Sequence, residues 1–146
     1  MKLTWIIVAL VSGAVLPLQA GLNARLGRAA ANPIYASLIS FVIGTLALLL
    51  YVIFSRQSVS WQGLREAPAY VWLGGLLGAF YVTAIVLAFP QIGPALTFGL
   101  VVAGQMLIAL LLDHFSILVA NPHPVNIWRV LGVLMIVGGV VLIRKF

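Results

Sequence analysis

Five long apolar stretches dominate this 146-residue chain, and each is long enough to cross a membrane as a helix. Because a helix rises about 1.5 Å per residue, roughly 20 apolar residues span a hydrocarbon layer about 30 Å thick. The chain is 64% hydrophobic and 7% charged, which leaves too little polar surface for a water-soluble protein. The sequence therefore predicts an all-α integral membrane protein. We expect it to form one domain over residues 1–146, with spans at 3–24, 34–54, 69–89, 95–112 and 125–143.

Proline placement supports this division, because proline fits the first turn of a helix, where its missing N–H would have no partner. Asn32 is a suitable N-cap for the second span. Pro90 is predicted to end the third span and to leave a tight hairpin before the fourth. Prolines open the last four spans: Pro33, Pro68, Pro94 and Pro124.

The basic residues are balanced between the two sides of the membrane that five spans imply. One side has Lys2, Arg56, Arg65 and Arg129, and the other has Arg25, Arg28, Arg144 and Lys145. The excess of Lys and Arg that orients most membrane proteins is therefore absent, and two copies inserted in opposite orientations are inversions of each other. The sequence predicts an antiparallel, dual-topology homodimer of ten helices, with one fixed orientation set by Arg25 and Arg28 as the alternative.

The first span has one polar face. Ser12, Gln19 and Asn23 share it, and Pro17 removes a backbone hydrogen bond nearby, which predicts a local break. Because an amide facing lipid is costly, Gln19 and Asn23 should face other helices or a wet cavity. We interpret both as candidate substrate-binding residues, and hydrogen bonds that merely hold helices together are the alternative.

Other spans contain further candidates for binding. Tyr51 and Tyr81 could form aromatic walls that hold a solute, and Gln105 offers another amide. Gly132 and Gly139, seven residues apart in the last span, present a smooth stripe suited to close helix pairing, either with another subunit or with another helix of the same chain.

The sequence allows two roles for Asp113, the acidic residue next to a span. With His114 it could form a proton-coupling pair, because histidine titrates near neutrality. Alternatively, Asp113 ends a helix and pairs with a neighbouring arginine. Two separated histidines and the absence of cysteine predict no metal site, no cofactor and no enzymatic activity, and the basic residues at span ends suit lipid headgroups rather than nucleic acid.

Four segments resemble the bacterial YdcZ-like family of the drug/metabolite transporter superfamily. They are residues 19–27 (QAGLNARLG), 40–45 (SFVIGT), 74–79 (GGLLGA) and 102–115 (VAGQMLIALLLDHF). The resemblance covers nearly the whole chain. It implies a bacterial inner-membrane location and a five-helix unit related to the small multidrug resistance exporters. The last helix of those exporters pairs through glycines at heptad spacing, so the resemblance makes Gly132 and Gly139 the candidate dimer contact. Those exporters bind protons and cations at a glutamate in their first helix, where this chain has Gln19 and Asn23.

These observations predict a transporter of a small organic solute that works by alternating access. A membrane scaffold or regulatory subunit that transports nothing is the alternative, and a dry seam of hydrogen-bonded amides would favour it. A channel is disfavoured, because no ring of charges or carbonyl-rich filter appears in the sequence. Without a deep acid, neutral and zwitterionic solutes remain open beside cations.

Overall fold

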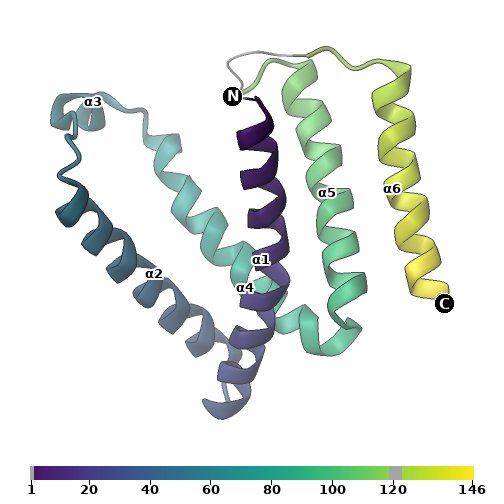
Figure 1. Ribbon diagram of the computed structural model, residues 1–146, viewed down its shortest axis with the longest axis horizontal. Helices are drawn as coiled ribbons and strands as arrows, with labels where there is room; N and C mark the ends of the chain where they lie inside the picture. Colours follow the sequence, from purple (N-terminus) through teal and green to yellow (C-terminus); the bar gives the residue numbers. More distant parts are fainter. Residues whose placement is uncertain (1, 119–122) are drawn as a thin grey trace. The chain divides into compact units, whose positions relative to one another are not determined.

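The computed structural model describes residues 2–118 and 123–146, and all regular structure in those residues is helical. The five apolar, membrane-length helices confirm the predicted number of spans and the all-α class. Figure 1 shows α1 (Lys2–Ala29), α2 (Pro33–Ser55), α3 (Trp61–Glu66), the 3₁₀ helix η1 (Ala69–Trp72), α4 (Leu73–Ile92), α5 (Pro94–His114) and α6 (Ile127–Lys145). The chain divides into an N-terminal unit, Met1–Gln91, and a C-terminal unit, Ile92–Phe146.

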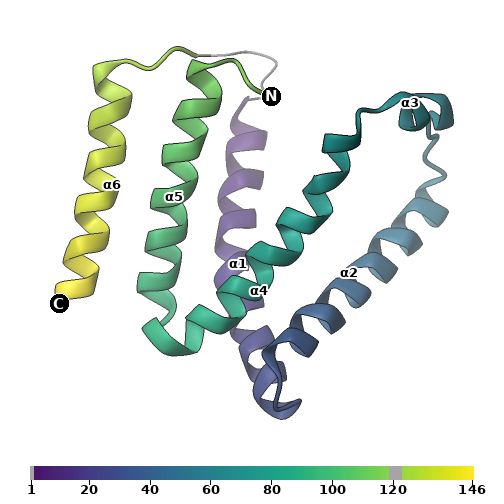
Figure 2. The same ribbon diagram turned by 180° about the vertical axis from the view of Figure 1, so that it is seen from behind.

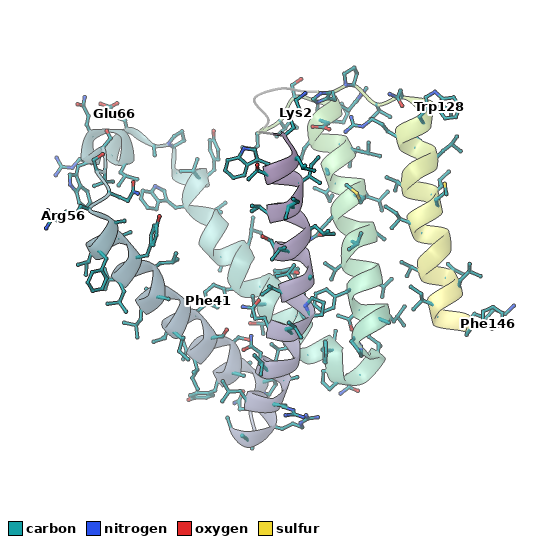
Figure 3. All side chains as sticks on the ribbon, viewed as in Figure 1. Lys2, Phe41, Arg56, Glu66, Trp128 and Phe146 are labelled. Atoms are coloured by element: carbon teal, nitrogen blue, oxygen red, sulfur yellow. The ribbon has the colours of Figure 1, made fainter. Side chains whose placement is uncertain are left out.

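In the N-terminal unit, α1 and α2 meet at the turn that joins them and diverge from there, and α4 crosses α1 (Figures 1 and 2). A methyl group added at Gly27 would lie 3.1 Å from the Pro33 Cα atom, so the close approach of α1 and α2 leaves little room for a side chain there. The ring of Phe89 on α4 lies against Gly21 of α1. The ring of Phe41 on α2, labelled in Figure 3, lies against Gly78 of α4.

The helices end at capping residues and at residues with a positive φ rather than at the limits of the apolar runs. The first helix continues past the predicted end at residue 24 and stops where Ala31 adopts a positive φ of 51°. Asn32 then caps α2 as predicted, accepting a hydrogen bond of 2.9 Å from the Ile34 amide. The prediction that Pro90 ends the third span is wrong: α4 continues to Ile92, and Gly93, at a φ of 77°, separates it from α5.

Pro17 lies inside α1, which is helical on both sides of it. The proline costs the helix one backbone hydrogen bond, because it has no N–H to donate. The helix nevertheless continues, so Pro17 does not interrupt α1.

In the C-terminal unit, α5 and α6 form an antiparallel pair (Figure 2). A methyl group added at Gly99 of α5 would lie 3.0 Å from Cγ2 of Val140 on α6, whose side chain is buried. Valine has little rotamer freedom to move aside. The absence of a side chain at Gly99 therefore sets the spacing of the two helices.

Gly99→Ala should destabilise the protein in detergent by about 1–3 kcal/mol, because overpacking forces helices apart or side chains off their rotamers. Unfolding in increasing sodium dodecyl sulfate, followed by circular dichroism, measures the change. Gly104→Ala on the same helix is the matched control, since a methyl group there meets nothing within 4 Å. Equal stability of the two variants would contradict the proposed close contact.

Large apolar side chains are exposed along all five membrane-length helices, and Val86 is the largest fully buried side chain among the described residues. A helix that is apolar all round belongs in lipid or against partner helices. The packed interior of each unit is accordingly thin. The buried apolar residues are Ala20, Ala24, Ala36, Ile85 and Val86 in the N-terminal unit and Ala103, Val133 and Val140 in the C-terminal unit.

Candidate functional site

Three helices of the N-terminal unit form an open groove, which we call the central groove. It has a volume of about 220 Å³ and lies between α1, α2 and α4. The polar face predicted for α1 contributes Gln19, and small residues of α2 leave space opposite it. The lining residues are Gln19, Ser40, Phe41, Gly44, Thr45, Leu48 and Val82.

Three polar side chains line the central groove: Gln19, Ser40 and Thr45. Among the described residues, none forms a hydrogen bond with the side chain of Gln19, Ser40 or Thr45. Several helical hydroxyls elsewhere donate to the carbonyl four residues earlier, at 2.8 Å for Ser12 and 2.6 Å for Thr97. Backbone carbonyls usually satisfy hydroxyls in this way in membrane helices. The groove thus gathers one amide and two hydroxyls that have no partner in the described part of the chain.

Asn23 lies one helical turn from Gln19 on the same face of α1. Its side chain is buried, at 6% exposure, and its Nδ2 atom has no hydrogen-bond partner among the described residues. A buried amide without a partner costs about 1–3 kcal/mol, so such groups are rare in folded proteins. The hydroxyl oxygen of Tyr81 on α4 is also buried and also has no hydrogen-bond partner among the described residues.

The other binding candidates lie outside the central groove. Tyr51 is 63% exposed near the end of α2, and Tyr81 precedes the lining residue Val82 without lining the groove itself. Gln105 is exposed on α5 in the C-terminal unit. The sequence analysis did not identify Ser40 and Thr45 as site residues, although both lie in segment 40–45, which carries part of the family resemblance. The roles of Gln19, Asn23, Tyr51, Tyr81 and Gln105 stay predictions.

Gly132 and Gly139 leave open surface on α6, since a methyl group added at either meets nothing within 4 Å. Gly132 also lines a second groove of about 240 Å³ between α5 and α6, together with Met106, Ala109, Leu110, Arg129, Val133 and Ile136. This surface could accept a closely packed helix, and its role in a dimer stays a prediction.

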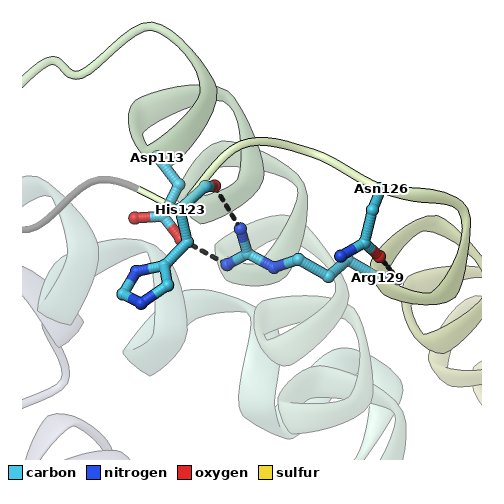
Figure 4. Close-up of polar contacts among 4 residues, drawn as sticks. All are labelled: Asp113, His123, Asn126 and Arg129. Carbon is cyan, nitrogen blue, oxygen red and sulfur yellow. Dashed lines mark hydrogen bonds and ion pairs between the residues drawn. The ribbon is translucent and has the colours of Figure 1, made fainter.

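Asp113, in the last turn of α5, pairs with an arginine of α6. Its carboxylate binds the guanidinium of Arg129, which also donates to the His123 carbonyl (Figure 4). Asn126 caps α6 by accepting a 3.0 Å hydrogen bond from the Arg129 amide. His114 is exposed and lies edge-on to Phe115, with 4.9 Å between ring centroids. This ion pair is the one that the second interpretation of Asp113 anticipated, and proton coupling by Asp113 and His114 stays a prediction.

Both members of the ion pair lie at the unfavourable end of their helix. Asp113 is in the last turn of α5, where the helix dipole disfavours an anion, and Arg129 is in the first turn of α6, where it disfavours a cation. The opposite charge of each residue therefore offsets the unfavourable interaction of the other with its helix dipole. With side-chain exposures of 18% and 32%, the two are partly shielded from water.

Asp113→Asn and Arg129→Gln should each destabilise the C-terminal unit by about 1–2 kcal/mol, because each leaves one charge at the wrong end of its helix. The double variant should lose clearly less than the sum of the two. A double-mutant cycle of unfolding in sodium dodecyl sulfate measures this coupling. Strictly additive losses would show that the pair contributes nothing.

The described residues contain no group of three His, Cys, Asp or Glu side chains that could hold a metal ion. The central groove offers hydrogen bonding by Gln19, Ser40 and Thr45 and apolar contact with Phe41, Leu48 and Val82.

Comparison with known proteins identifies the family. Residues 4–142 match the family described as "Putative inner membrane exporter, YdcZ". The chain is 25% identical over 143 residues to the inner membrane protein YdcZ of Escherichia coli (strain K12). The aligned region covers 93% of this chain and 92% of that protein. No solved structure matches the chain. With five helices that could span a membrane, this is a multi-pass inner-membrane protein, and the chain belongs to the YdcZ family.

Proposed function

We propose that this protein transports a small organic solute across the inner membrane by alternating access, as a member of the drug/metabolite transporter superfamily. The observation that carries the proposal is the central groove, in which an amide and two hydroxyls without a partner among the described residues face an open space between apolar helices. A polar group inside a membrane costs free energy unless it forms a hydrogen bond with another polar group or with a ligand. The description of the family as an exporter supports the outward direction.

The transporting unit in this proposal is an antiparallel homodimer of ten helices. Two features support it: the four-to-four balance of basic residues and the open glycine surface of α6. Transporters of this general kind place their substrate site near the midplane, between two units of inverted orientation. Each copy would then contribute one central groove to a shared site.

The scaffold alternative requires amides that are hydrogen-bonded across a dry helix seam. Gln19 lines an open groove instead, and among the described residues neither Gln19 nor the Nδ2 atom of Asn23 has a hydrogen-bond partner. This arrangement favours transport over a purely structural role.

An export assay tests the proposal. Cells that lack their own YdcZ protein are grown with a panel of toxic organic compounds, with and without this chain. We expect the chain to raise the tolerated concentration of at least one compound and to lower its accumulation in the cell. A panel of broad chemical composition that gives no difference in growth or accumulation would contradict export.

A further inference from the structure

We infer that the central groove selects solutes with no formal charge and at least one hydrogen-bonding group. This inference rests on the proposed function and names its substrate class. It excludes the cations and zwitterions that the sequence left open, and it excludes anions as well.

The lining of the groove supplies hydrogen bonds without charge. Gln19 can donate and accept, and the hydroxyls of Ser40 and Thr45 can do the same. The remaining lining is apolar, with the ring of Phe41 and the side chains of Leu48 and Val82. Such a surface can replace the hydrogen bonds that water makes to one alcohol, amide or carbonyl group of a ligand. It cannot compensate for the loss of hydration of a full charge.

A second copy of the chain cannot supply the missing charge. Four long segments of the sequence contain no Asp, Glu, Lys, Arg or His, and together they hold most of every span: residues 3–24, 29–55, 67–112 and 130–143. The charged residue nearest to Gln19 along α1 is Arg25, about 9 Å further along the helix axis. Arg25 is exposed in the last turns of α1, where its long side chain can reach the headgroups. The site therefore stays uncharged in any assembly of identical chains.

A further groove in the N-terminal unit strengthens the exclusion of cations. It has a volume of about 170 Å³, and Arg28 and Gln91 line it beside Ala24, Gly27, Pro33, Val86, Leu87 and Pro90. Asn23 is buried on α1 between Gln19 of the central groove and Ala24 of this one. A cation that approached the central groove from this end would first meet the positive charge of Arg28.

Protection of a cysteine in the groove tests the inference on purified protein in detergent. The chain has no native cysteine, so Ser40→Cys provides a single thiol whose alkylation by N-ethylmaleimide can be followed by mass spectrometry. Three probes of nearly equal size differ in charge: 3,3-dimethylbutan-1-ol is neutral, choline is its cationic counterpart, and 3,3-dimethylbutanoate is an anion. Each probe fits a groove whose volume equals that of about seven water molecules.

We expect the alcohol to slow alkylation of Ser40→Cys, with half-protection at a concentration at least about tenfold below that of either ion. Ser58→Cys, in the exposed connection between α2 and α3, is the matched control and should show no protection by any probe. Gln19→Glu, combined with Ser40→Cys, places a carboxylate in the groove and should reverse the preference towards choline. Protein that elutes as the wild type in gel filtration confirms that each variant is folded.

The outcomes separate this inference from the proposed function. Protection by choline or by the anion at the concentration that suffices for the alcohol would overturn the neutral-solute inference, while the export assay could still uphold transport. If no probe protects Ser40→Cys, the groove is not the binding site, and the inference is overturned with it. Export that fails in cells while the alcohol protects would contradict transport and leave the selectivity of the groove in place.

Discussion

About half of the molecules should react when intact cells that express Ser58→Cys are treated with a membrane-impermeant thiol reagent. The reason is the balance of basic residues: four lie on each side of the membrane, so neither orientation is favoured during insertion. Pairing with Asp113 reduces the free charge of Arg129, and the remaining count of three against four is still nearly balanced. Ser58 is exposed outside the helices, and the chain has no other thiol, so the labelled fraction, measured by gel shift, reports sidedness directly.

Ala30→Cys is the matched control for this experiment, because it lies exposed at the turn between α1 and α2, on the opposite side of the membrane by chain order. Dual topology predicts partial labelling of both cysteines, with fractions that add up to the whole population. Complete labelling of one and none of the other would mean that every chain points the same way. The proposed antiparallel homodimer would then be wrong, and the chain would form either a parallel assembly or half of a heterodimer.

The number of membrane helices was predictable from sequence because hydrocarbon thickness and helical rise leave little choice of length. The helix ends were less predictable, because they depend on backbone chemistry rather than on hydropathy. The first helix continues through Arg25 to Ala29, since a charged residue at the membrane boundary can remain helical and reach the headgroups. The short helix α3 was missed because it is only six residues long and its cap, Ser60, is an ordinary loop residue in the sequence.

The sequence predicted which candidate site residues share a face of α1, but it did not predict which residues of other helices lie close to them. The spacing of Gln19 and Asn23 placed both on one face of α1, but it could not tell that Gln19 lines a groove while Asn23 is buried. That distinction depends on where α2 and α4 approach α1, which is a property of tertiary packing. Pairing of Asp113 with an arginine was one of two predicted roles, but the sequence could not identify Arg129 as the partner, because the two residues come from different helices and are 16 positions apart.

Gln19→Ala should reduce export of any compound that the wild-type chain exports by at least about tenfold, and it should leave assembly unchanged. The physical reason is that the amide is the largest polar group of the central groove, and a solute group bound there would lose its partner inside a membrane. Gln19 has no hydrogen-bond partner among the described residues, so its removal breaks no structural bond. Accumulation of the exported compound in cells, together with gel filtration of the purified variant, measures function and assembly separately.

Gln57→Ala is the matched control, since it removes the same amide from an exposed position in the connection after α2 and should export at the wild-type rate. Thr45→Val removes a hydroxyl from the central groove at nearly constant volume, and it should give a smaller loss than Gln19→Ala because two polar groups remain. This gradation distinguishes a binding site from a packing defect: a packing defect would lower the yield and stability of the variants in parallel with export. Wild-type export by Gln19→Ala would remove Gln19 from the site and would leave the groove between α1, α2 and α4 without the observation on which transport was proposed.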